Sequence, residues 1–290
     1  MARAHTIAIL GATSRIGRDF IASYPDPATL RLFARKRWQP YSEFPDGDYG
    51  AVINFVGVGD PARAREMGTK ILSVTRQYDE MALDFQARHP GTRYIFLSSG
   101  AAYGGEFTAP ACDGGETPIA ANNTGNYYGA AKQEAEARHR ALPGQSIFDL
   151  RVFNYVSREM DLTAPYLLAD MVHCVQDCCV FRTADWPMTR DYLHPNDFAQ
   201  LVRCCLVADG NMALDCYSQA PITKRELLDL MASHFGMQYE ITSVPANSNV
   251  TGEKPHYYSQ SRRAAALGYI PSWSSQSGIL AEVSAILSRN

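Results

Sequence analysis

Residues 6–17 read TIAILGATSRIG, and this stretch decides the fold of the chain. The apolar run 6–10 leads directly into a glycine-rich turn, and a helical pattern follows over 16–24. Glycines between a strand and a helix let backbone amides approach a pyrophosphate, and the helix N-terminus adds the positive end of its dipole. The stretch therefore predicts a dinucleotide-binding unit, the alternative being a tight turn without a ligand. The expected cofactor contacts are Gly11, Thr13, Ser14, Arg15, Ile16 and Gly17.

The first half of the chain alternates apolar runs with helical patterns, as parallel βαβ units do. We therefore predict a Rossmann-type α/β fold with a doubly wound parallel sheet and a smaller C-terminal lobe that binds substrate. Beyond the first strand, strands are expected over 30–34, 51–56, 93–97 and 147–153, and helices over 61–88 and 126–141.

The chain is expected to divide into two parts. The cofactor-binding domain is predicted over 1–155, with 196–217 returning to it, and the substrate-binding lobe over 156–195 and 218–290. In the second half we expect helices over 164–180 and 224–235, a strand over 239–244 and a loop over 246–261.

The composition excludes several classes of protein. The chain has 290 residues, a net charge of -3 and 46% hydrophobic residues, as in an ordinary globular protein. Such a charge favours neither nucleic acid nor a membrane surface, and no apolar run suits a signal peptide or a membrane span. The seven cysteines, an odd number, suit the reducing cytoplasm, and we expect buried structural thiols and no metal. His173, Cys174 and Cys178 could share a helix face, but too few further ligands accompany them for a metal site.

The end of the second strand bears on the choice of cofactor. Arg35, Lys36 and Arg37 follow this strand, and no acidic residue stands there to hold a ribose 2′-hydroxyl. A basic cluster suits a 2′-phosphate, which Arg15 could also reach from the glycine turn. We therefore expect NADP(H) rather than NAD(H), bound in part by Arg35 and Lys36. The alternative is a solvated basic loop.

Tyr128 and Lys132 lie four residues apart in a predicted helix, so that a phenol and an ammonium share one face. A nearby cation stabilises a phenolate and lowers the pKa of the tyrosine, which can then act as a general acid or base. Because such a pair also arises by chance, it indicates a catalytic site only together with other motifs.

Those other motifs are present, and together they resemble the extended short-chain dehydrogenase/reductase family of nucleotide-sugar epimerases, dehydratases and reductases. They occur in the order of that family and extend over nearly the whole chain. The matching segments are GATSRIG, AVINFVGVG, YIFLSSGAAYG, YGAAK, LRVFNY, RDYLHPNDFAQ and the C-terminal YYSQSRRAAALGYIP.

The resemblance implies roles for further residues. Phe55, Val56 and Gly57 would pack on the cofactor, Asn154 would contact substrate phosphate, and Arg190 would contact the nucleotide diphosphate. Ser99 would be the catalytic hydroxyl that orients the substrate oxygen towards Tyr128, with Ser98 as second candidate. For Ser99 the alternative is a strand-end hydroxyl that caps the backbone.

The resemblance also narrows the reaction. Gly100 and Ala101 follow Ser99 where sugar dehydratases of the family carry an Asp-Glu pair, and no cysteine stands there for a further epimerisation step. The favoured reaction is therefore reduction of a keto group, with a nucleotide-activated 4-keto-6-deoxysugar as the nearest substrate.

Other interpretations stay open: an NAD-dependent nucleotide-sugar 4-epimerase, a reductase of a small carbonyl compound, or a non-catalytic NADP(H)-binding regulator. Departures from the family pattern bear on them, since Ser14 replaces the middle glycine of the turn and Lys254 is the nearest candidate for a second diphosphate-binding cation. The family also implies a homodimer that pairs the helices at 61–88 and 126–141 across a two-fold axis.

Overall fold

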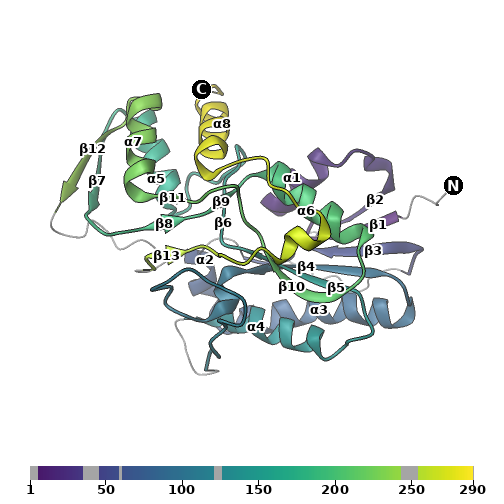
Figure 1. Cartoon of the computed structure of the whole chain (residues 1–290). Coiled ribbons are helices and arrows are strands. Elements are labelled where there is room, and N and C mark those ends of the chain that lie inside the picture. Colours follow the sequence, from purple (N-terminus) through teal and green to yellow (C-terminus); the bar gives the residue numbers. More distant parts are fainter. Residues whose placement is uncertain (1–5, 35–45, 59–60, 121–125, 243–253, 290) are drawn as a thin grey trace.

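The computed structural model describes residues 6–34, 46–58, 61–120, 126–242 and 254–289 (Figure 1). Its centre is a six-stranded parallel sheet with the strand order β10-β5-β4-β3-β1-β2. The strands are β1 (Thr6–Leu10), β2 (Leu30–Phe33), β3 (Tyr49–Asn54), β4 (Arg93–Ser99), β5 (Ile147–Val152) and β10 (Asn211–Asp215). The predicted Rossmann-type α/β fold is confirmed.

Both faces of this sheet are buried, because side chains alternate along each strand. In β1, Ile7 and Ile9 belong to the hydrophobic core on one face, whereas Ala8 and Leu10 belong to the core on the other. In Figure 1 one helix pair lies above the sheet and another below it. The upper pair is α1 (Arg15–Ser23) and α6 (Pro195–Val207), and the lower pair is α3 (Lys70–Arg88) and α4 (Tyr127–Arg140).

A second hydrophobic core lies beyond the carboxyl ends of the strands, at the left of Figure 1. Its helices are α5 (Leu167–Gln176), α7 (Lys224–Phe235) and α8 (Ser275–Leu287). Short strands surround it: β7 (Val180–Ala184) beside β12 (Gln238–Thr242), β6 (Asn154–Tyr155) beside β9 (Tyr192–Leu193), and β8 (Thr189–Arg190) between β11 (Ile222–Thr223) and β13 (His256–Tyr257). The short 3-10 helices are η1 (Pro27–Thr29), η2 (Gly100–Tyr103) and η3 (Arg263–Leu267).

The chain crosses between the two cores more than once. Helix α6 packs on α1, and β10 extends the sheet beside β5, so the segment 195–215 joins the first core. Ala264 and Tyr269 belong to the same core. The division of the chain at the predicted boundaries therefore stays an interpretation.

Two predicted helices differ from the sequence pattern, one because it is interrupted and the other because it ends early. The helix expected over 61–88 is two helices, α2 (Pro61–Met67) and α3, because Gly68 adopts a left-handed φ of 50° between them. The helix expected over 164–180 covers only α5. Cys178 has a φ of 52°, and the chain then enters β7 at Val180. Of the loop expected over 246–261, residues 246–253 lie outside the described residues, and β13 falls within the remainder.

The expectation of buried thiols was wrong for most cysteines. Only Cys205 and Cys216 are buried, whereas Cys112, Cys178 and Cys179 are exposed. Because α5 ends at Gln176, Cys178 does not continue the helix that carries His173 and Cys174. Within the described ranges, no helix is both long and apolar enough to cross a membrane, and no group of three or more His, Cys, Asp or Glu side chains is arranged to hold a metal ion.

Candidate active site

The glycine turn after β1 has the geometry expected of a phosphate-binding loop. Gly11 has a φ of 74°, and a Cβ there would lie 2.8 Å from the backbone of Phe55 and Val56, so only glycine fits. Ser14 caps α1 by accepting a hydrogen bond of 3.1 Å from the Gly17 amide. The first-turn amides of a helix have no intrahelical acceptor, so the N-terminus of α1 can bind an anion.

Of the residues expected to select the 2′-phosphate, Arg35 and Lys36 lie outside the described residues. The Arg15 guanidinium lies over the rings of Tyr155 and Tyr166, at 6.0 and 5.8 Å from their centroids. Its Nε is buried without a hydrogen-bond partner in the structure, as suits a group that receives an anion. The preference for NADP(H) stays a prediction.

The end of β3 forms the wall beside the turn. The Phe55 ring packs between Phe20 and Phe198 in the core, so only the backbone of Phe55 can face a cofactor. The Val56 amide donates to Asn54 Oδ1 at 3.0 Å. A Cβ at Gly57 would lie 3.8 Å from Lys132 Nζ, which brings this segment close to the active-site helix.

Helix α4 brings Tyr128 and Lys132 together as predicted, with Lys132 Nζ 5.7 Å from the centre of the Tyr128 ring. Lys132 is 2% exposed, and its ammonium donates to the Leu97 carbonyl at 2.7 Å. Burial lowers the pKa of Lys132 to about 8, although the Asp79 and Glu136 carboxylates act in the opposite direction. Burial also raises the pKa of Tyr128, and the Ser99 hydroxyl acts against that shift. The expected lowering of the tyrosine pKa is therefore not seen.

Ser99 ends β4 beside this pair. Its Oγ accepts a 3.2 Å hydrogen bond from the Ala101 amide, which is the capping role, and the same hydroxyl also interacts with Tyr128. Ser98, the second candidate, is turned away, since its hydroxyl donates to Glu136 at 2.6 Å. Of the two serines, Ser99 is therefore the one whose hydroxyl lies beside Tyr128.

Arg190 is a buried cation without an ion pair. It is 4% exposed, and within the described ranges no carboxylate lies within salt-bridge distance of it. Its Nη1 donates to the carbonyls of Thr189 and Lys254 at 3.0 and 2.7 Å. Burial lowers the pKa of Arg190, and burial and Arg190 together lower the pKa of Lys254. Among the described residues no carboxylate pairs with either cation, so their positive charge is not compensated there.

Asp191 and Asp197 are close to Arg190 in the sequence, but neither forms an ion pair with it. Asp191 accepts hydrogen bonds from the Ser218 amide, and Asp197 accepts them from the backbone at 272–273. The Asn154 amide donates to the backbone carbonyls of Asp191 and Tyr257 at 3.3 Å, and its contact with substrate phosphate stays a prediction.

Tyr257 is a residue of the site that the sequence did not indicate. Its hydroxyl lies 3.5 Å from Ser99 Oγ, and burial raises its pKa to about 12. The Arg190 guanidinium and the Lys254 ammonium lie 5.9 and 4.9 Å from the centre of its ring. Tyr257 therefore lies between the Ser99 hydroxyl and the two cations. It falls in a segment expected to be a loop, and no motif distinguishes it from its neighbour Tyr258.

Solved structures with this fold are similar over nearly the whole length of the chain. UDP-glucose 4-epimerase from Thermotoga maritima is 16% identical, with a TM-score of 0.76 and coverage of 98% of this chain and 99% of that one. RMD from Pseudomonas aeruginosa, solved with NADPH, is 19% identical, with a TM-score of 0.74 and coverage of 99% and 98%. UDP-N-acetylglucosamine 4-epimerase from Methanobrevibacter ruminantium is 13% identical, with a TM-score of 0.79 and coverage of 99% of each chain. At these identities the likeness shows a shared fold.

The sequence itself shows the family. No curated protein matches the chain, but the model of the NAD-dependent epimerase/dehydratase family matches residues 33–213, which is more than half of its length. The matched region includes the end of β3, Ser99, the Tyr128–Lys132 pair and Arg190. The chain belongs to the NAD-dependent epimerase/dehydratase family.

Proposed function

We propose that the chain is an NADP(H)-dependent reductase of a keto group on a nucleotide-activated sugar, a 4-keto-6-deoxysugar. The observation that carries this proposal is the pair of cations formed by the buried Arg190 and the partly buried Lys254, with Tyr257 lying between them and the Ser99 hydroxyl. A diphosphate held by the cations would place the attached sugar near Ser99 and Tyr128.

The residues of the site support a simple division of work. The bound nicotinamide would supply the hydride. Ser99 donates a hydrogen bond to the substrate oxygen, and Tyr128 gives the proton that turns the developing alkoxide into a hydroxyl. Lys132 stabilises the phenolate that remains and holds the nicotinamide ribose. Its buried ammonium lies beside Tyr128, as both tasks require.

The residues present fit a dinucleotide. The N-terminus of α1, the Arg15 Nε without a hydrogen-bond partner among the described residues, and the close approach of Gly57 to Lys132 would provide positions for pyrophosphate and ribose. The basic run at 35–37 and the similarity to the NADPH-bound structure from P. aeruginosa support NADP(H), whereas other neighbours were solved with NAD. Calorimetric titration should show tighter binding of NADPH than of NADH by about 1–3 kcal/mol. Equal affinity would overturn this preference.

The likeness to UDP-glucose and UDP-N-acetylglucosamine 4-epimerases supports a second candidate, a nucleotide-sugar 4-epimerase. A reductase consumes one NADPH for each sugar, whereas a 4-epimerase returns the hydride and consumes none. Candidate nucleotide-ketosugars should therefore be screened for loss of nicotinamide absorbance, and UDP-sugars for epimerisation. Tyr128→Phe should lower kcat by about 10²–10⁴-fold and leave the binding of both ligands intact.

We also propose a homodimer through the outer face of α3 and α4. A hollow of about 530 Å³ lies there, lined in part by Leu72, Met81 and Glu134. Light scattering at micromolar concentration should give about twice the 32.1 kDa mass of one chain. A single species at the chain mass would contradict the dimer.

A further inference from the structure

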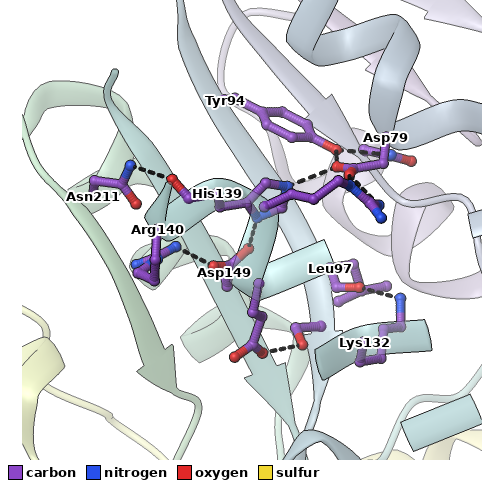
Figure 2. A network of polar contacts seen from close by, with 12 residues as sticks. Asp79, Tyr94, Leu97, Lys132, His139, Arg140, Asp149 and Asn211 are labelled. Atoms are coloured by element: carbon purple, nitrogen blue, oxygen red, sulfur yellow. Dashed lines mark hydrogen bonds and ion pairs between the residues drawn. The ribbon is translucent and has the colours of Figure 1, made fainter. Parts of the chain in front are cut away.

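A histidine lies between two aspartates under the sheet, on the side of α3 and α4 (Figure 2). His139 Nδ1 lies 2.6 Å from Asp149 Oδ1, and its Nε2 lies 2.7 Å from Asp79 Oδ1. All three side chains are 0% exposed. With a carboxylate at each ring nitrogen, the imidazole is held as a doubly donating cation.

From Asp79 a chain of hydrogen bonds continues to the cofactor side of the sheet. The Tyr94 hydroxyl donates to Asp79 Oδ1 at 2.9 Å, as Figure 2 shows, and accepts from Asn54 Nδ2 at 3.0 Å. The side-chain oxygen of Asn54, Oδ1, in turn accepts a hydrogen bond from the Val56 amide at 3.0 Å. The chain therefore runs from α4 through α3 and β4 to the backbone just beyond the end of β3.

The same histidine also lies near the catalytic lysine. The Phe96 ring stands between them, 5.3 Å from the His139 ring and 4.4 Å from Lys132 Nζ. Lys132 and His139 are seven residues apart in α4 and so share one helix face. Gly57, which follows Val56 at the end of the hydrogen-bonded chain, also lies close to Lys132 Nζ.

Other charged groups surround His139 on each packed element. From α4, Arg138 pairs with Asp79 and with Glu134, and Arg140 pairs with Asp149. The carboxylates of Asp79 and Asp149 come from α3 and β5. The charges of the network are therefore matched within it, and its hydrogen bonds have fixed directions.

We propose that His139, Asp79, Tyr94 and Asn54 are positioning residues, which hold the Val56–Gly57 backbone against Lys132 and so shape the wall on which the nicotinamide cofactor binds. The inference rests on the proposed function, because that wall matters only if the chain binds a nicotinamide cofactor. Beyond β3 no further ladder bond fixes Val56, and the Asn54 carboxamide takes that place. Loss of a hydrogen bond in the network should therefore displace the Val56–Gly57 backbone at the site.

Tyr94→Phe removes one oxygen atom from the middle of this path and leaves the ring packing in place. We expect the Kd for NADPH, measured by calorimetry, to rise roughly three- to tenfold, as for loss of one hydrogen bond in a binding wall. The matched control is Tyr269→Phe. Its buried hydroxyl donates to the Tyr217 carbonyl at 2.6 Å, outside the site. Both variants should lose thermal stability, but only Tyr94→Phe should weaken NADPH binding.

The outcomes separate the two proposals. If the wild type binds NADPH and both variants bind it equally well, the network has a structural role only and the inference is wrong. If the wild type binds neither NADPH nor NADH, the proposed function fails and the inference fails with it. Should Tyr94→Phe not fold, Asn54→Ala breaks the same path at its last step and must weaken NADPH binding for the inference to stand.

Discussion

Two groups of charged side chains, one among α3, α4 and β5 and the other at β8 and the start of β13, are built in opposite ways. In the network under the sheet, the carboxylates of Asp79 and Asp149 meet the imidazole of His139 and two arginines. At the carboxyl ends of the strands, the contacts of Arg190 and Lys254 with other described residues are to carbonyl groups and aromatic rings. Removing one member of the matched group leaves a buried charge without its partner, whereas the proposed counter-charge of the two cations is a bound anion.

The first prediction concerns the matched group and carries the largest effect on stability. Burial raises the pKa of Asp79, but His139 and Arg138 outweigh it and hold the pKa below its usual value, so the carboxylate is charged in the folded protein. Asp79→Ala leaves the buried imidazolium of His139 with one carboxylate instead of two and removes one of the two carboxylates of Arg138, and should lower the free energy of unfolding by about 3–5 kcal/mol. Urea denaturation measures this change. Asp229→Ala, which removes the exposed partner of Arg225, is the control and should cost less than about 1 kcal/mol. Equal losses would show that the network is not a matched group.

The second prediction concerns the same group of charges, in which a rise in pH should deprotonate His139. Burial lowers the pKa of His139, but Asp149 and Asp79 raise it to about 9, above the usual value of 6.5. Because the folded-state pKa is the higher one, this stabilisation is full below pH 6.5 and is lost as pH rises through about 9. The loss should be on the order of 3 kcal/mol.

The control for this titration is His139→Gln, which has no such proton to lose. Burial lowers the pKa of Lys132 to about 8, so the free energy of unfolding gains a contribution that rises with pH above pH 8. This contribution is present in both proteins. The difference between wild type and variant therefore isolates His139. Parallel stability curves from pH 6 to pH 10 would contradict the doubly paired imidazolium.

The two groups also differ in how far the sequence predicts them. The glycine turn, the Tyr128–Lys132 pair and Arg190 stand in motifs, because a ligand fixes both their type and their spacing. Asp79, Tyr94 and His139 follow no spacing rule, since only the order of the strands in the sheet brings them together. Tyr257 reaches Ser99 from a distant part of the chain for the same reason.

Helix boundaries show a similar limit. The predicted bounds of α7, 224–235, are those of the structure, in which Thr223 and Glu226 form a capping box at the start of the helix. The pattern does not predict the end of α5, where Cys178 takes a left-handed conformation that the sequence does not signal. Local propensity is overridden there by the packing of β7 beside β12.

The third prediction concerns the unmatched group. Arg190→Met removes a buried cation that pairs with no carboxylate of the described residues but donates two hydrogen bonds to backbone carbonyls, so the melting temperature should fall only slightly. Affinity for the nucleotide-sugar should fall by about 1.5–3 kcal/mol, roughly 10- to 150-fold, because a diphosphate loses its charge-assisted hydrogen bonds. NADPH affinity should not change, since its pyrophosphate is expected at the glycine turn. Calorimetry with both ligands, together with the melting temperature, measures all three quantities. If both affinities fall together with stability, Arg190 has a structural role.

The last and smallest effect is expected at Lys254, which is less deeply buried than Arg190 and lies over the rings of Phe107 and Tyr257. Lys254→Met should weaken nucleotide-sugar binding by only about 0.5–1 kcal/mol, because removing one of two like charges also removes their repulsion in the free protein. The same repulsion predicts that the effects of Lys254→Met and Arg190→Met on affinity are not additive. A double-mutant cycle measures this coupling. Inorganic pyrophosphate should raise the melting temperature of the wild type more than that of the double variant, because its charge matches the two cations. If the effects add and pyrophosphate stabilises both proteins equally, the cations do not share one anion.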